Sequence, residues 1–157
     1  MTSREEGLGT RFPEAERSPG LALWQVTNRW QAAMRTALEP HGLTHVQYVL
    51  LASLVWLHQK DRDDMITQAN LAEFAATDVM MTSQVVRALE KKDLLERLPH
   101  PHDGRARLLR PTPAGADAAR AATADVEDAD SSFFSALHDA GSFVTELGRL
   151  RTPPTAD

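Results

Sequence analysis

Residues 78–112 decide the fold expected for this chain, and they read DVMMTSQVVRALEKKDLLERLPHPHDGRARLLRPT. The first half has apolar residues at the spacing of one buried helix face, namely Val79, Val85, Val86 and Leu89. The opposite side carries short or polar residues, Met80, Ser83, Gln84 and Arg87. This pattern predicts a helix with one side packed on a core and the other side free to meet a partner.

The second half of the stretch predicts a two-stranded ribbon. Apolar residues flank the turn-forming segment 99–104 on both sides, Leu94, Leu95 and Leu98 before it and Leu108 and Leu109 after it. Between Arg87 and Arg110 there are seven basic and four acidic side chains, a local charge of +3 in a chain whose net charge is −5. A helix followed by a basic hairpin is the outline of a winged helix-turn-helix, so we expect this part to bind DNA.

The rest of the chain predicts a mainly α fold with this ribbon as a small β wing. Residues 1–17 and 152–157 lack apolar periodicity and are expected to be flexible tails. A long helix is predicted from Ser18-Pro19 to about Glu39, and a capping pattern at Thr44 and Gln47 opens the next. Further helices are predicted over 68–75, from 112 to about 137, and over 142–150. Leu71 and Phe74 are expected to point inward, and Met65-Ile66 to form a very short strand.

Composition narrows the class of protein. A length of 157 residues with 42% hydrophobic and 25% charged residues is typical of one globular domain. The absence of cysteine excludes a disulfide framework and a thiol switch. With no signal peptide and no apolar run of about 20 residues, the sequence predicts a cytoplasmic protein without a membrane span.

The candidate DNA-contacting residues lie on the predicted helix and ribbon. They are Met80, Thr82, Ser83, Gln84 and Arg87 in the helix, and Asp103, Arg105 and Arg107 in the ribbon. Glutamine can pair with adenine and arginine with guanine through two hydrogen bonds each. We expect Asp103 to orient the guanidinium of Arg105, and Arg107 and Arg110 to meet phosphates. The plainer alternative for each is a solvated surface residue.

A family resemblance covers most of the chain. The run LAEFAATDVMMTSQVVRALEKKDLLER (71–97), with DGR at 103–105 and TPAG at 112–115, resembles the MarR (multiple antibiotic resistance regulator) family of dimeric transcription factors. The resemblance implies one domain over 18–151, with a DNA-binding lobe at 44–112 and dimerisation helices at 18–43 and 113–151. It also implies that Arg105 enters a minor groove. Asp93, where the family usually turns on glycine, and Pro111, in place of a strand residue, depart from the pattern.

The same resemblance implies a small-molecule pocket near the junction of the first two helices. The candidate lining residues are Trp24, Asn28, Trp30, His41, His45 and Tyr48. Large aromatic residues at helical spacing also fit core or dimer packing, so both interpretations stay open. The ligand expected here is small and aromatic or anionic.

No catalytic motif is visible, and no enzyme activity or cofactor is predicted. The histidine pairs His100 and His102, and His41 and His45, offer too few ligands for a metal site. We therefore expect a homodimeric repressor that binds an inverted repeat in double-stranded DNA and is released by a ligand. The alternatives are a winged-helix protein-interaction module without DNA binding, and a metal-responsive regulator.

Overall fold

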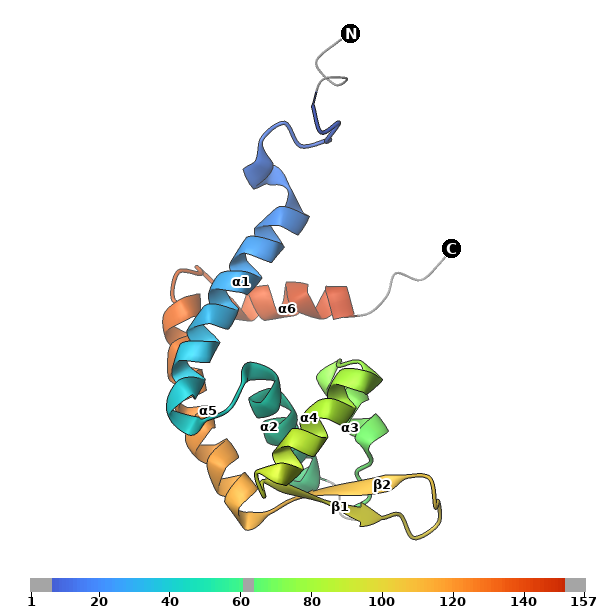
Figure 1. Cartoon of the computed structure of the whole chain (residues 1–157). Coiled ribbons are helices and arrows are strands. Elements are labelled where there is room, and N and C mark those ends of the chain that lie inside the picture. Colours follow the sequence, from blue (N-terminus) through green and yellow to red (C-terminus); the bar gives the residue numbers. More distant parts are fainter. Residues whose placement is uncertain (1–6, 61–63, 152–157) are drawn as a thin grey trace.

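The computed structural model describes residues 7–60 and 64–151 (Figure 1). Residues 1–6 of the predicted N-terminal tail, the whole predicted C-terminal tail 152–157, and residues 61–63 lie outside the described residues. The N-terminal elements are η1 (Ala15–Arg17), α1 (Pro19–Leu38), η2 (Glu39–His41) and α2 (His45–Lys60). They are followed by α3 (Gln68–Ala75), α4 (Val79–Lys91), β1 (Leu95–Pro99), β2 (Arg107–Pro111), α5 (Pro113–Phe134) and α6 (Ala140–Arg151).

Local capping signals place the helix starts where the sequence predicted them. Thr44 and Gln47 bond reciprocally, each side chain accepting from the other's amide at 3.2 Å. Thr67 forms the same kind of box with Asn70. The hydroxyl of Thr112 accepts from an amide in the first turn of α5. These side chains satisfy amide groups that the first turn of a helix leaves without partners.

The elements form two parts joined through α2 and α5 (Figure 1). α1 packs along α5, while α3, α4 and the hairpin gather at the other end around α2. The fully buried side chains come from both parts, Met34, Leu38, Leu50, Leu51, Leu54, Leu71, Thr82, Val86, Leu89, Leu95 and Leu109. A single hydrophobic core therefore connects α4 to the long helices α1 and α5.

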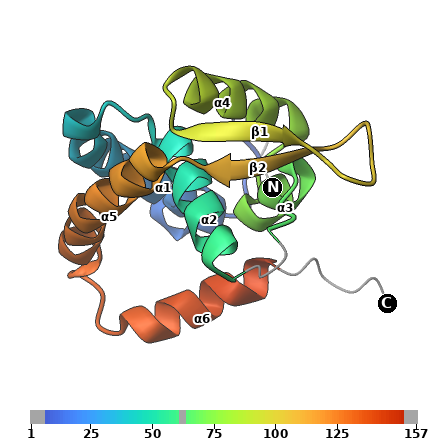
Figure 2. The same ribbon diagram turned by 90° about the horizontal axis from the view of Figure 1, so that it is seen from below.

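The hairpin is a two-stranded antiparallel sheet that extends past the helices (Figure 2). Its register runs from Leu95 opposite Pro111 to Pro99 opposite Arg107. The strand expected at Met65-Ile66 is reduced to a bridge, in which Thr67 pairs with Leu108 and the amide of Leu109 donates to the carbonyl of Ile66 at 2.8 Å. This bridge fixes the base of the hairpin to the segment before α3.

Three expectations about the core and the last helices were wrong. Val79 is 72% exposed because, as the first residue of α4, it lies beyond the part of the helix that faces the core. Phe74 is 50% exposed and stacks instead on the half-exposed ring of Trp56, with 5.3 Å between ring centroids. The long helix α5 ends at Phe134, before Leu137, and α6 begins at Ala140, two residues earlier than expected.

Over the described residues, no helix combines the length and apolar character needed to cross a membrane.

Candidate nucleic-acid interface

Helix α4 has one face in the core and one face in solvent. Asp78 caps it, its carboxylate accepting from the amide of Met81 at 2.8 Å. Val85, Val86 and Leu89 are buried, as the sequence predicted. The opposite side exposes Met80, which is 75% accessible, together with Gln84 and Arg87, and Ser83 is half-buried beside them. The exposed side thus offers an amide, a guanidinium and a thioether to an external partner.

Thr82 does not belong to that exposed side, and its expected DNA contact was wrong. The residue is fully buried, and its hydroxyl donates to the carbonyl of Asp78 at 2.7 Å. The hydroxyl oxygen of Thr77 lies 2.7 Å from the hydroxyl oxygen of Thr82. Because the single proton of Thr82 is used on Asp78, Thr77 must be the donor in this second bond. Thr82 therefore anchors the first turn of α4 to the turn that precedes it.

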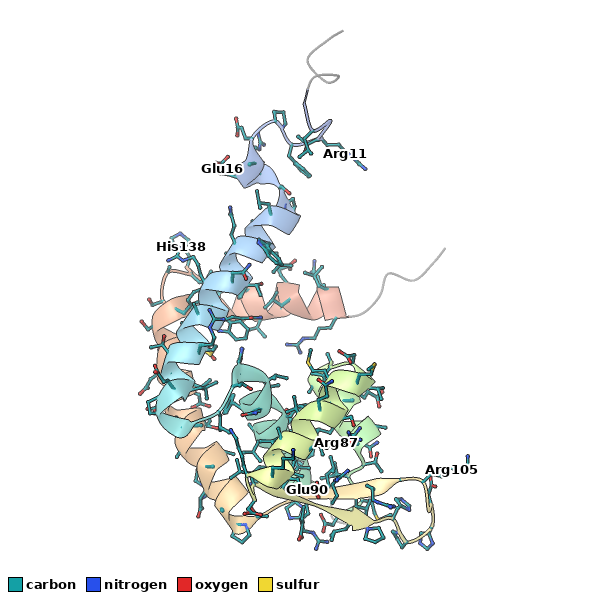
Figure 3. The ribbon with its side chains drawn as sticks, viewed as in Figure 1. Arg11, Glu16, Arg87, Glu90, Arg105 and His138 are labelled. Atoms are coloured by element: carbon teal, nitrogen blue, oxygen red, sulfur yellow. The ribbon has the colours of Figure 1, made fainter. Side chains whose placement is uncertain are left out.

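The tip of the hairpin is a turn built by side-chain to backbone bonds. The ring of His100 accepts from the amides of His102 at 3.1 Å and Asp103 at 3.0 Å. Asp103 in turn accepts from the backbone amide of Arg105 at 2.9 Å. The expectation that Asp103 holds the guanidinium was wrong, because the carboxylate is used on the backbone. Figure 3 shows Arg105 at the hairpin tip with its side chain directed away from the body, and none of the described residues accepts a hydrogen bond from its guanidinium.

The two arginines of β2 differ in their surroundings. Arg107 is exposed, and its guanidinium donates to carbonyls of the turn, those of Ala106 at 3.2 Å and Gly104 at 3.5 Å. Arg110 is half-buried and pairs with Asp64, whose other carboxylate oxygen lies 2.5 Å from Nδ1 of His58. Arg110 therefore attaches the base of β2 to the end of α2, which corrects the expectation that it meets phosphate.

The six residues expected to line a ligand pocket do not surround one cavity. Three of them bind α5 instead: His41 contacts Asp125 at 2.6 Å, Trp30 donates to Asp130 at 2.7 Å, and Tyr48 donates to Thr123 at 3.2 Å. Trp24 is 68% exposed, and Asn28 donates to its backbone carbonyl at 2.7 Å. Of the six, only His45 lines the large hollow.

That hollow, of about 1080 Å³, lies between α1, α2 and α4. Its polar walls come from Arg35 and Gln31 of α1, His45 of α2 and Gln84 of α4. Burial lowers the pKa of His45, while the Asp130 carboxylate opposes this shift and Arg35 adds to it. The rings of Trp30 and His45 make a T-shaped contact, with 5.0 Å between their centroids. The sequence analysis did not predict that α1 and the turn after it line this hollow. The signal was present, because Gln31, Arg35 and Glu39 repeat at the four-residue spacing of one helix face.

Within the described ranges, no three histidine or acidic side chains come together as a potential metal site.

Comparison with known proteins identifies the family. The MarR family model matches residues 43–106, which include the helix pair α3–α4, β1 and the turn that follows it. Over 141 residues, the chain is 40% identical to the uncharacterized HTH-type transcriptional regulator YdcH of Bacillus subtilis (strain 168), covering 90% of this chain and 95% of that protein. The chain belongs to the MarR family. It is a DNA-binding transcriptional regulator with a winged helix-turn-helix fold.

Solved MarR-like structures share the arrangement of elements. CouR from Rhodococcus jostii RHA1, solved with p-coumaroyl-CoA, matches with a TM-score of 0.77 at 22% identity, over 92% of this chain and 99% of that one. MepR from S. aureus, solved in a DNA complex, matches with a TM-score of 0.73 at 19% identity, over 85% of this chain and 95% of that one. At these identities the likeness shows the fold alone.

Proposed function

We propose that this MarR-family regulator binds an inverted repeat in double-stranded DNA as a homodimer and represses transcription. Helix α4 enters the major groove, where Gln84, Arg87, Ser83 and Met80 meet base edges. The hairpin reaches the adjacent minor groove through Arg105, with Arg107 and the Asp103 turn supporting it. The regulator acts in the cytoplasm and has no catalytic role in this proposal.

One observation carries the DNA-contact proposal. The polar residues of α4 are exposed on the side away from the core, and the guanidinium of Arg105 projects from the hairpin that follows (Figure 3). Hydrogen-bonding side chains on an exposed helix face, next to a basic hairpin, match what base edges and phosphates require. Two acidic side chains of this region are engaged within the protein: Glu90 pairs with Arg97 at 2.7 Å, and Asp103 bonds to the hairpin backbone.

The dimer is proposed from apolar surface at the end of the molecule away from the hairpin. Exposed apolar side chains cluster on α1 (Leu21, Leu23, Trp24 and Val26) and along the C-terminal segment (Leu137, Val144 and Leu150). Helix α6 contacts α5 through Phe143, whose ring lies 5.8 Å from that of Phe134. Apolar faces of this kind call for a partner. A two-fold axis would place two copies of α4 on half-sites about 34–36 Å apart.

The hollow beside α4 supports a second proposal, release of DNA by a ligand. Met81 and Gln84 line the hollow and also belong to the DNA-facing end of α4. A ligand held there would favour the arrangement of α4 that fits it, at the expense of the one that fits DNA. Arg35 and His45 favour an aromatic or anionic ligand. CouR, which shares this fold, was solved with an aromatic acyl-CoA.

The test is fluorescence anisotropy with DNA taken from upstream of the protein's own gene, titrated at two salt concentrations. We expect sequence-specific binding whose affinity falls as the salt concentration rises. Gln84→Ala should reduce the free energy of binding by about 1–3 kcal/mol and relax the base preference at one position in each half-site. Gln59→Ala, an exposed glutamine on α2, is the matched control and should leave binding unchanged. Absence of specific binding at low salt would overturn the proposal and favour a protein-interaction module. A Zn²⁺-dependent thermal shift that chelator reverses would favour a metal-responsive regulator.

A further inference from the structure

The C-terminal end of α4 is tied to the junction of α1 and α2 by one side chain. The ammonium group of Lys92 donates to the carbonyl of Gly42 at 2.7 Å and to the side-chain oxygen of Gln47 at 3.0 Å. The carbonyl and the amide oxygen come from residues about 50 and 45 positions earlier in the chain. Hydrogen bonds from a charged donor are stronger than neutral ones, and two acceptors fix the position of the ammonium better than one.

The junction that receives Lys92 is itself held in place. Gly42 has a left-handed backbone, with φ of 62°, and ends η2. The amide oxygen of Gln47 that accepts from Lys92 also accepts from the backbone of Thr44, where α2 begins. Immediately before Gly42, the ring of His41 contacts Asp125 of α5 at 2.6 Å. A polar chain therefore runs from α5 through the junction to the end of α4.

The junction and α4 both line the hollow described above. Glu39, Leu43 and Thr44 of the junction line it on one side, and Met81, Gln84 and Val85 of α4 line it on the other. Near its N-terminus α4 is anchored through Thr82 to the preceding turn, within its own lobe. Lys92 is different, because it connects α4 to the segment that leads out of α1.

We propose that Lys92 is a positioning residue that sets the distance between α4 and the long helices, and thereby the half-site spacing that the dimer accepts. This role rests on the DNA binding proposed above. Without the tie, the lobe that carries α4 gains freedom to move relative to α1 and α5, because such lobes move as rigid bodies about a few junction residues. The dimer would then bind DNA with a wider range of half-site spacings, and its affinity at the best spacing would exceed that at the other spacings by less.

The neighbouring lysine provides a matched control. Lys91 is also exposed and carries the same charge, but within the described part of the chain its ammonium group contacts no polar group. Lys92→Met and Lys91→Met therefore remove the same charge from adjacent positions, and only the first breaks the tie. A lysine that merely meets a phosphate would weaken binding equally at every spacing and would make the salt dependence shallower.

The experiment measures affinity for a series of inverted repeats in which the half-sites are moved apart or together by one to three base pairs. We expect Lys92→Met to weaken binding about tenfold at the best spacing, with little change at the others and an unchanged salt slope. Lys91→Met should change the affinity by the same factor at every spacing or leave it unchanged. Equal profiles for the two variants, or a uniform loss with a shallower salt slope for Lys92→Met, would overturn the proposal.

A DNA-free measurement separates this role from the DNA binding on which it rests. Because the chain has no cysteine, Arg87→Cys gives one spin-label site on each α4. Double electron–electron resonance then reports the distance between the two copies of α4 in the dimer. Lys92→Met should broaden that distance distribution and Lys91→Met should not. Broadening without any DNA binding by the parent protein would refute the proposed function alone, whereas an unchanged distribution in Lys92→Met would refute the positioning role.

Discussion

The backbone of Gly115, in the first turn of α5, lies against the carbonyl group of Leu94, just before β1, so closely that a β-carbon on the glycine would overlap that oxygen. The amide of Thr112 donates to the same carbonyl at 3.1 Å, and the Thr112 hydroxyl caps Gly115 at 3.0 Å. The spacing Thr-x-x-Gly thus joins a helix cap to a close approach between the hairpin and α5.

This contact predicts the effect of Gly115→Ala. The added methyl group meets backbone, which cannot move aside as a flexible side chain would, so we expect a loss of about 2–3 kcal/mol in the free energy of unfolding. Urea denaturation followed by circular dichroism measures it. Gly20→Ala, a helical glycine of α1 with open space around it, should change stability by less than about 1 kcal/mol. Similar stabilities for Gly115→Ala and the parent would contradict the close approach.

The turn between α3 and α4 offers a stabilising change. Ala76 ends α3 with a φ of 52°, a left-handed conformation that strains any residue with a β-carbon. Ala76→Gly relieves this strain, and we expect a gain of about 0.5–1 kcal/mol in the free energy of unfolding. Ala75→Gly, one residue earlier in the regular helix, should have the opposite sign. The pair can be compared by thermal melts, and a loss of stability in Ala76→Gly would argue against the left-handed turn.

Removing the hairpin arginine should affect DNA binding without affecting the fold. For Arg105→Ala we expect weaker binding, with the larger loss on A·T-rich flanks, where the minor groove is narrow. The slope of log affinity against log salt should become shallower, because each subunit displaces fewer counterions. Arg120→Ala, which removes an exposed arginine of α5 paired with Asp117, is the control. An Arg105→Ala protein with normal affinity and an unchanged slope would show that the hairpin does not contact DNA.

His45 should make stability depend on pH. Burial lowers the pKa of its imidazole below the ordinary value of 6.5, so below that pH the unfolded chain binds a proton that the folded chain takes up only at lower pH. The free energy of unfolding should therefore fall as the pH drops from about 6.5 through the folded-state pKa. In His45→Gln this part of the pH dependence should be lost, and in His138→Gln, which removes an exposed histidine between α5 and α6 (Figure 3), it should remain. Urea titrations at several pH values distinguish the two.

Most of the fold could be predicted because its signals are local. Helix caps such as Thr44 with Gln47, and the apolar spacing of Val85, Val86 and Leu89, depend on residues a few positions apart. The turn-forming run at 99–104 likewise predicted the hairpin. The exposed position of Phe74 could not be predicted in this way, because Trp56, the ring on which it stacks, lies 18 positions earlier in another helix.

In the candidate site, too, features that depend on nearby residues could be predicted, and contacts between distant residues could not. That Gln84 and Arg87 share an exposed face follows from helical periodicity. Thr82 was misplaced because a threonine can satisfy its hydroxyl inside the protein, and its partner Thr77 lies across a turn. The expected pocket residues His41, Trp30 and Tyr48 instead pair with α5 residues 75 to 100 positions away, and only the folded chain reveals those contacts.

Helix α4 has buried residues that pack in the core and exposed residues that face solvent, and this separation has an evolutionary consequence. Thr82 and Leu89 are fully buried in the core, while Met80, Gln84 and Arg87 are exposed to solvent. On the DNA contacts proposed above, single mutations at the exposed positions change which operator is preferred without lowering the stability of the fold. Paralogues that arise by gene duplication could acquire separate target genes in a few steps, each passing through a folded protein.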